Sequence, residues 1–359
     1  MNDVTDNSAR AYQNELLQGV ARTFALTIPQ LPEPLIDVVG NAYLLCRIAD
    51  TIEDDSAIEI KEKCTLGREF IDIVVNKAAA DHFAQRFSAL VSAERLPAEK
   101  QLIRETAQVI AITRLFSTGQ QATLARCVHT MTEGMLYYQA HSGREGFANI
   151  SIFDNYCYHV AGVVGEMLTE LFCQYSSQFD RERLMPLAVS FGQGLQMTNI
   201  LKDIWEDYAR GVCWVPQDVF QKHGFDLTDV AKASDSDEFA AGLKAMVTIA
   251  VGHLHNAATY IHLIPSNETG LRKFCLWAVG MAFLTLERIY RKPNFTAGKQ
   301  VKIGKRQVLT VIALTKIACG NHRLTRWLLK LWSRRLPVAA AVSTDAKHKQ
   351  ISTWFRGMV

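Results

Sequence analysis

Proline and glycine are scarce in this chain. Its 359 residues include 9 prolines and 21 glycines, fewer than the roughly 12% of residues that the two types usually contribute. Collagen-like, low-complexity and linker-rich chains are therefore excluded, and an all-β protein with many turns is disfavoured. Proline breaks helix interiors, and the prolines leave long stretches free, at 35–96, 98–185, 217–264 and 294–336. These stretches favour helices.

Cysteine pairs and long apolar runs are also missing. None of the 8 cysteines stands in CxxC spacing or beside histidines at zinc-ligand intervals, which is typical of buried thiols in a reducing compartment. The N-terminal segment is polar with early acids, so we expect no signal peptide. The longest charge-free stretch, 245–267, contains three histidines and Pro265, so we expect no transmembrane segment. The sequence predicts a cytoplasmic protein that can lie at a membrane surface.

Acidic residues are absent from one long segment. Between Arg288 and Arg335 there are 13 Lys/Arg and no Asp or Glu, so the rest of the chain carries 26 basic against 36 acidic residues. The formal charge of +3 therefore hides an acidic body and a basic C-terminal segment. A globally basic nucleic-acid binder is excluded, and we expect no nucleic-acid partner.

What is present indicates an all-α protein of ten or more helices. Apolar residues recur at helical intervals in 35–49 and 156–172, and alternating strand patterns are scarce. The clearest predicted loops are 30–33, 142–148, 211–217 and 292–304. We expect one domain over 1–336, in which 314–336 is a basic amphipathic C-terminal helix region, followed by a tail at 337–359.

An acidic motif of the form DxxED occurs twice. The first copy contains Asp50, Glu53 and Asp54, and the second contains Asp203, Glu206 and Asp207. Residues i and i+4 of a helix share a face, and paired carboxylates there are ligands that Mg²⁺ prefers, together with phosphate oxygens of a substrate. One copy alone would more simply be a solvated acidic helix end. Two copies, each at the end of an apolar helix, favour the metal site.

Polar residues continue each acidic motif along its helix. Arg47 and Tyr43 precede Asp50 on its face, and Asn199 and Gln196 precede Asp203, while Arg210 follows the second copy. A single residue of this kind would more often serve a structural hydrogen bond. The whole stripe suits a phosphate–metal site at the mouth of an apolar cavity.

A third segment places Tyr156 near three valines, at 160, 163 and 164. Core packing explains the valines. A cavity wall for an apolar substrate would have the same composition, and a tyrosine ring in it could face a carbocation, an interaction worth about 0.5–2 kcal/mol.

Four segments together resemble the squalene/phytoene synthase family, the head-to-head prenyl transferases. They are ARTFA (21–25), YLLCRIADTIEDD (43–55), YCYHVAGVVGEM (156–167) and QMTNILKDIWEDYARGVCWVP (196–216). The resemblance covers residues 15–320. It implies an all-α isoprenoid-synthase bundle with a large central apolar cavity, which takes two prenyl diphosphates and Mg²⁺.

The resemblance also implies roles for single residues. Metal ligands and their supports would be Asp50, Glu53, Asp54, Asn199, Asp203, Glu206 and Asp207. The substrate-binding set would be Arg22, Thr23, Phe24, Arg47, Val160, Val164, Lys202 and Arg210. Catalytic positions near the reacting carbons would be Tyr43, Tyr156, Gln196 and, as a weaker match, Tyr260. Lys202 stands where the family commonly has Arg, and lysine lacks the bidentate geometry of arginine.

The segment VKIGKRQVLTVIALT (301–315) resembles the basic flap of the squalene-forming members. That likeness implies that Lys302, Lys305 and Arg306 bind phosphates of NADPH. Two molecules of farnesyl diphosphate would condense to presqualene diphosphate, which NADPH would reduce to squalene. Members that stop without the reduction, giving dehydrosqualene, phytoene or presqualene diphosphate, remain alternatives. A non-catalytic member that acts in protein assembly is a remote one.

The segment 321–335 is predicted to be a basic amphipathic helix. Four basic residues share one face, and four apolar residues, Leu324, Trp327, Leu328 and Leu331, share another. Such helices suit anionic membrane surfaces, so peripheral membrane contact is expected. A last helix that packs its apolar side onto the body is an equal alternative.

Overall fold

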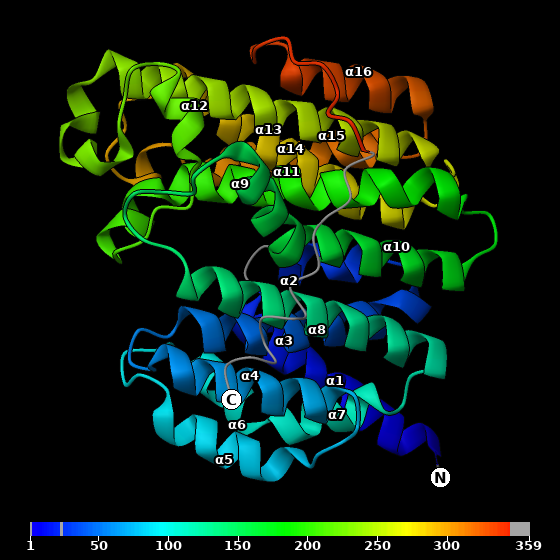
Figure 1. Cartoon of the computed structure of the whole chain (residues 1–359). Helices are drawn as coiled ribbons and strands as arrows, with labels where there is room; N and C mark the ends of the chain where they lie inside the picture. The colour runs from blue at the N-terminus through cyan, green and yellow to red at the C-terminus, as the bar shows by residue number, and fades with distance from the viewer. Residues whose placement is uncertain (1, 22–23, 345–359) are drawn as a thin grey trace. The chain divides into compact units, whose positions relative to one another are not determined.

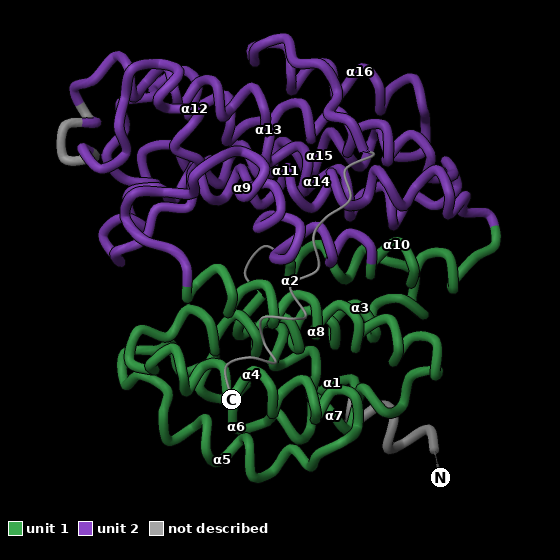
Figure 2. The backbone as a smooth tube through the Cα atoms, in the orientation of Figure 1, with its two compact units in different colours: residues 1–140, 167–177, 350–359 green, residues 141–166, 178–349 purple. Residues whose placement is uncertain are grey.

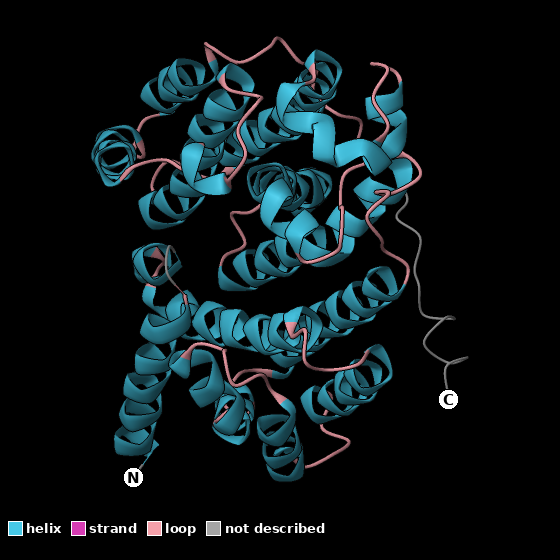
Figure 3. Ribbon diagram, turned by 90° about the vertical axis from the view of Figure 1, so that its left-hand side faces the viewer, coloured by secondary structure: helices cyan, strands magenta, loops and turns pink. Residues whose placement is uncertain are grey.

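The computed structural model describes residues 2–21 and 24–344, which form helices joined by loops (Figures 1 and 3). Over these residues it contains no strand, only an isolated bridge between Phe147 and Pro216. The α-helices are α1 (Asn2–Val20), α2 (Phe24–Thr27), α3 (Glu33–Asp54), α4 (Ile60–Val74), α5 (Ala80–Leu90), α6 (Pro97–Arg104), α7 (Thr106–Thr113), α8 (Thr118–Ala140), α9 (Ile150–Cys157), α10 (Val163–Tyr175), α11 (Arg181–Ala209), α12 (Gln217–Gln221), α13 (Asp237–Leu263), α14 (Thr269–Arg291), α15 (Lys305–Ala318) and α16 (His322–Ser333). Shorter 3₁₀ or π turns are η1 (Ile28–Gln30), η2 (Tyr158–Gly162), η3 (Leu227–Asp235) and η4 (Gly298–Gln300).

The chain divides into two compact units, coloured separately in Figure 2. Within the described residues, unit 1 comprises 2–140 and 167–177, and unit 2 comprises 141–166 and 178–344. The first acidic motif lies in unit 1 and the second in unit 2. The prediction of one domain over 1–336 stays a prediction.

Unit 1 is built around α3, which packs against α1, α7 and α8. Leu44, Leu45 and Ile48 of α3 are fully buried. The polar Asn41 is buried as well, but its side chain donates to the carbonyl of Val109 at 3.0 Å and accepts from the hydroxyl of Thr113 at 2.7 Å. These bonds satisfy the buried amide and tie α3 to α7, which fixes the helix that carries the first motif.

Unit 2 is built around α11, which packs against α13, α14 and η2. The predicted helix over 156–172 is interrupted there, because residues 158–162 form the π turn η2 between α9 and α10. Two glycines lie where the backbones touch. A Cβ on Gly165 would lie 2.1 Å from the carbonyl oxygen of Ala188, and one on Gly192 would lie 2.1 Å from that of Ala161. Glycine therefore permits the close approach that places Tyr156 and its neighbours against α11.

Candidate active site

The first acidic motif lies at the end of α3, and a basic residue of the same helix, Arg47, lies beside it. The guanidinium of Arg47 lies 3.6 Å from a carboxylate oxygen of Asp50. Burial raises the pKa of Asp50 to about 7, with Arg47 opposing the shift and Asp54 adding to it. A carboxylate that is costly to ionise in this setting is stabilised by a nearby cation. Asp50 and Asp54, one helical turn apart, thus bring several carboxylate oxygens together, and their negative charges repel each other.

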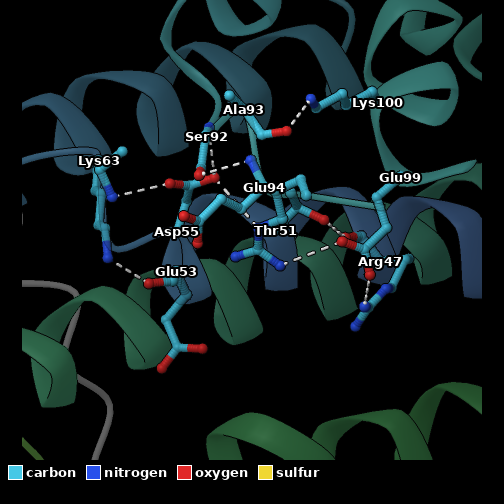
Figure 4. A network of polar contacts seen from close by, with 12 residues as sticks. Arg47, Thr51, Glu53, Asp55, Lys63, Ser92, Ala93, Glu94, Glu99 and Lys100 are labelled. Atoms are coloured by element: carbon cyan, nitrogen blue, oxygen red, sulfur yellow. Dashed lines mark hydrogen bonds and ion pairs between the residues drawn. The ribbon is translucent and has the colours of Figure 1, made fainter. Parts of the chain in front are cut away.

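Arg47 is held from the other side by Glu99 of α6, as Figure 4 shows. Glu99 is nearly buried, and its second oxygen lies 3.4 Å from Arg95. Arg95 in turn donates at 3.2 Å to Asp55, which also accepts the backbone N–H of Ser92 at 3.0 Å. Sequence reasoning did not find Glu99, because 52 residues separate it from Arg47 and nothing in its charged segment distinguishes it from its neighbours.

Replacing Glu99 by Gln is expected to lower the free energy of unfolding by about 1–3 kcal/mol, because two half-buried guanidiniums then face a neutral amide and lose a charge-assisted hydrogen bond. Urea denaturation followed by circular dichroism measures the change. The matched control is Glu94→Gln in the same segment, where the side chain is exposed. Equal stability of the two variants would contradict the role assigned to Glu99 in positioning Arg47.

Other predicted residues of unit 1 gather near the start of α2. Tyr43 donates its hydroxyl to the carbonyl of Val20 at 3.2 Å, and its ring lies 5.4 Å from that of Phe24. Arg22 and Thr23, between these contacts in the chain, lie outside the described residues. Glu53 is buried, and its backbone carbonyl accepts from Lys63 while its carboxylate points away from that lysine (Figure 4).

The second acidic motif, on α11, repeats the pairing of acid and base. Lys202 lies 3.1 Å from a carboxylate oxygen of Asp203 and donates at 3.5 Å to Asn199. Arg210 pairs with Asp207, which is buried. In both units, therefore, basic residues predicted to bind diphosphate, namely Arg47, Lys202 and Arg210, are in contact with carboxylates predicted to bind metal.

Glu206, the remaining acid of that motif, binds the loop 292–304, which leads into the basic residues 302, 305 and 306. Its carboxylate accepts the backbone N–H of Gly298 at 2.9 Å, which attaches η4 to α11. The other end of the loop is braced by Arg288, which donates to the carbonyl of Lys302 and to the side chain of Gln307. Lys302, Lys305 and Arg306 are exposed. The structure thus brings the turn that precedes the predicted flap to the second motif, a proximity that no feature of the sequence indicated.

Tyr156 lies in an aromatic cluster of unit 2. Its buried ring stacks on Trp214, with centroids 4.6 Å apart and planes 10° apart, and lies 5.3 Å from Phe147. Trp214 belongs to the loop after α11 and was not among the predicted site residues, although it lies within the fourth resembling segment. Val160 and Val164 are half-buried, as is Gln196. Tyr260, on α13, is buried with its ring edge-on to Phe191 at 5.6 Å.

The donor chemistry fits Mg²⁺ held jointly with a substrate. Among the residues that the structure describes, no three His, Cys, Asp or Glu side chains gather closely enough to hold a metal ion by themselves. Each motif instead offers a pair of carboxylates on one helix face. Mg²⁺ is commonly bound by one or two carboxylates plus substrate phosphates and water, so an acidic pair beside Arg or Lys suits a metal–diphosphate complex.

Comparison with known proteins shows that the chain is similar to squalene and phytoene synthases. The sequence matches the squalene/phytoene synthase profile over residues 17–307. It is 29% identical over 316 residues to the squalene synthase of Schizosaccharomyces pombe, covering 86% of this chain and 65% of that one. It is 30% identical over 344 residues to squalene synthase ERG9 of Candida albicans, covering 94% and 74%. The chain thus spans about two thirds to three quarters of the length of these relatives.

Solved structures give the same fold. The complex of TcSQS with the ligand BPH1237 superposes with a TM-score of 0.76 at 22% identity, covering 98% of both chains. A dehydrosqualene synthase in complex with a ligand superposes with a TM-score of 0.63 at 18% identity, covering 87% of this chain and 96% of that one. The all-α isoprenoid-synthase fold expected from the sequence is confirmed.

Proposed function

Because the chain belongs to the squalene/phytoene synthase family, we propose that it is a squalene synthase, a prenyl transferase that joins two molecules of farnesyl diphosphate. The observation that carries the proposal is the repeated pairing of an acidic motif with a base, Arg47 with Asp50 on α3 and Lys202 with Asp203 on α11. Two such pairs suit two diphosphates. The squalene synthases among its relatives support the squalene-forming reaction over the phytoene and dehydrosqualene alternatives.

The first step would be loss of diphosphate from one farnesyl group. Mg²⁺, when bound, would neutralise the charge that develops on the leaving diphosphate. In unit 1, Asp50 and Asp54, with Glu53 in support, would bind Mg²⁺. In unit 2, Asp203 and Asp207 would do the same, with Asn199 as a neutral oxygen donor and Glu206 in support. Arg47, Lys202 and Arg210 would contact the phosphate oxygens directly and stabilise the same charge, with Arg22 and Thr23 as further contacts.

The allylic cation would then be attacked by the double bond of the second farnesyl group, and loss of a proton would close the cyclopropane of presqualene diphosphate. The stacked rings of Tyr156 and Trp214 suit the stabilisation of a cation, and the hydroxyl of Tyr156 is our candidate for assisting the proton transfer. Tyr43, Gln196 and Tyr260 would line the reacting carbons. Val160 and Val164, with Phe24, would help to exclude water, which would trap the cation.

The reductive step would begin with loss of the remaining diphosphate and rearrangement of the resulting cation, which hydride from NADPH would quench. Lys302, Lys305 and Arg306 are exposed on and after the loop that Glu206 anchors, and their charges suit the phosphates of that cofactor. Incubation with farnesyl diphosphate and Mg²⁺, with and without NADPH, tests the proposal by product analysis. Squalene should form only with NADPH. An identical product in both incubations would overturn the proposal in favour of a non-reducing member, and no product would favour a non-catalytic one.

Changing Lys302, Lys305 and Arg306 together to Gln is expected to raise the KM for NADPH about tenfold, since three solvent-exposed phosphate contacts are lost at about 0.5 kcal/mol each. Presqualene diphosphate should still form at the rate of the unchanged enzyme. The charge-matched control changes Arg183, Lys222 and Lys244, all exposed in unit 2, to Gln. A triple variant whose KM for NADPH matches that of this control would remove the flap from the proposal.

The expected location also belongs to this proposal. Across the described residues, no helix combines the length and apolar character that crossing a bilayer requires. The proposed substrate and product both carry long hydrocarbon chains, so contact with a membrane surface through 321–335 would shorten the path of an insoluble product to the bilayer.

A further inference from the structure

Helix α15 exposes apolar side chains that a surface helix would normally bury. Its inward side is formed by Val311, Thr315 and Ala318, which are buried. Residues 309, 313 and 317 follow one another at intervals of four, so they form a stripe on the opposite side. Leu309 is 64% exposed and Ile317 71%. An amphipathic helix with apolar residues on both sides has a second surface to cover.

Helix α16 has the same character, and packing divides its predicted apolar face. Leu328, predicted to share that face with Leu324 and Trp327, is fully buried together with Thr325. Leu329 and Trp332 are buried beside them. These four residues are spaced three and four apart, so they lie on one side of the helix. This is the side that packs against the rest of unit 2. Leu324 and Trp327 remain 43% and 58% exposed. Two large apolar side chains of α16 therefore stay in contact with solvent after the helix has packed.

The two helices turn these side chains away from the core of unit 2. Both pack against α14 and against each other, and only a short turn at 319–321 joins them. Since their buried sides face α14, their exposed sides face outward together. Leu309, Ile317, Leu324 and Trp327 therefore belong to one outer surface of the α15–α16 hairpin.

Charge distinguishes the partner that this surface fits. Residues 305–335 contain eight Lys/Arg and no acid. Lys316, Arg323, Arg326 and Lys330 are exposed beside the apolar side chains. Exposed apolar residues among basic ones are typical of helices that lie in the interface of an anionic bilayer, and tryptophan favours the headgroup level. A second copy of the chain would have to bring basic residues against basic residues, which is unfavourable.

We propose that the outward faces of α15 and α16 form a docking surface for an anionic lipid bilayer. Leu309, Ile317, Leu324 and Trp327 enter the boundary between headgroups and acyl chains, and the surrounding bases contact lipid phosphates. This surface extends the contact expected from 321–335 alone by adding α15. Only its use, delivery of an apolar product to the bilayer, rests on the proposed function.

Co-sedimentation with vesicles of phosphatidylcholine alone, or mixed equally with phosphatidylglycerol, tests the proposal. The protein should bind the mixed vesicles at least tenfold more tightly, and the preference should decline as salt is raised. The apolar variant Leu309→Ser, Ile317→Ser, Trp327→Ser and the charge variant Arg323→Gln, Arg326→Gln, Lys330→Gln should each lose at least tenfold in affinity. The apolar control is Leu115→Ser, at a residue of unit 1 that is 63% exposed.

Equal binding by the apolar variant and its control would overturn the proposal, as would a concentration-dependent dimer, detected by light scattering without lipid, that only the apolar variant loses. Unchanged circular dichroism and Tm show that the variants are folded. As an independent measurement, lipids brominated on the acyl chain should quench the fluorescence of the unchanged protein more than that of Trp327→Phe. Turnover of farnesyl diphosphate to presqualene diphosphate, measured without vesicles and without NADPH, should be the same in all variants. Vesicle binding without any such turnover in the unchanged protein would contradict the proposed function and leave the docking surface standing.

Discussion

Replacing Asp203 by Asn is expected to slow turnover of farnesyl diphosphate about 10²–10³-fold, which corresponds to about 3–4 kcal/mol of lost transition-state stabilisation. Asparagine keeps the size of the side chain and one acceptor oxygen but removes the charge that would hold Mg²⁺ against the leaving diphosphate. The rate of squalene formation at saturating substrate, measured across a range of Mg²⁺ concentrations, gives the effect. Additional Mg²⁺ should restore only part of the rate.

The variant should fold normally, so the loss can be assigned to chemistry. The side chain of Asp203 is 42% exposed and that of its partner Lys202 25%, and pairs this accessible to water contribute about 0–1 kcal/mol to stability. A thermal melt within a few degrees of the unchanged protein would confirm this.

The matched control lies one turn away. Glu206→Gln removes one charge from the same motif but keeps an oxygen that can accept the N–H of Gly298. We expect turnover to fall about tenfold, which is the lower end of the effect that changing a supporting residue of a metal site has. If Glu206→Gln slowed turnover as much as Asp203→Asn does, the assignment of Asp203 as a metal ligand and Glu206 as its support would be wrong.

The helices and the two motifs could be predicted because their signals are local. The i, i+4 spacing of Asp50 and Asp54 fixes their common face as soon as the segment is helical, and the same geometry brings Arg210 to Asp207. Absence of proline marks these helices, although Pro186 lies inside α11. It is the sixth residue of α11, beyond the first turn, and costs one backbone hydrogen bond there.

Contacts between distant segments carried no such signal. Glu99 meets Arg47, and Gly298 meets Glu206 across 92 residues, only after the helices have packed. The side on which α16 is buried was also left open by the sequence, because the apolar residues of that helix extend over more than half of its circumference. Which of them face the body is decided by the groove that α14 and α15 offer. The pattern of α16 alone cannot specify that choice.

Replacing Gly192 by Ala is expected to destabilise the protein by about 3 kcal/mol, against the direction that helix propensity predicts. Gly192 lies well inside α11, where alanine is normally favoured over glycine by about 1 kcal/mol. The new Cβ, however, would lie 2.1 Å from the oxygen and 2.6 Å from the carbon of the Ala161 carbonyl. Both are backbone atoms, so a helix must shift, and overpacking of this kind costs about 1–3 kcal/mol or more.

Urea denaturation measures the loss of stability in Gly192→Ala, and Gly119→Ala on α8 is the control. There the new Cβ would lie 3.4 Å from the side-chain oxygen of Gln174, a flexible neighbour that can move aside, so stability should be unchanged or slightly raised. Stability of Gly192→Ala equal to that of the control would contradict the close approach of η2 to α11.

The same substitution tests whether that approach serves the chemistry. Ala161 belongs to the π turn η2, and π turns inside helices occur frequently at functional sites. The clash would push η2 away from α11 and move Val160, which immediately precedes Ala161, while Asp203 and Asp207 stay in place farther along α11. At a temperature where the variant is fully folded, we therefore expect turnover to fall about tenfold or more with an unchanged Mg²⁺ requirement, because misplacing a positioning element by about 1 Å can cost about 10²-fold. A folded variant with full turnover would mean that η2 supports the fold alone.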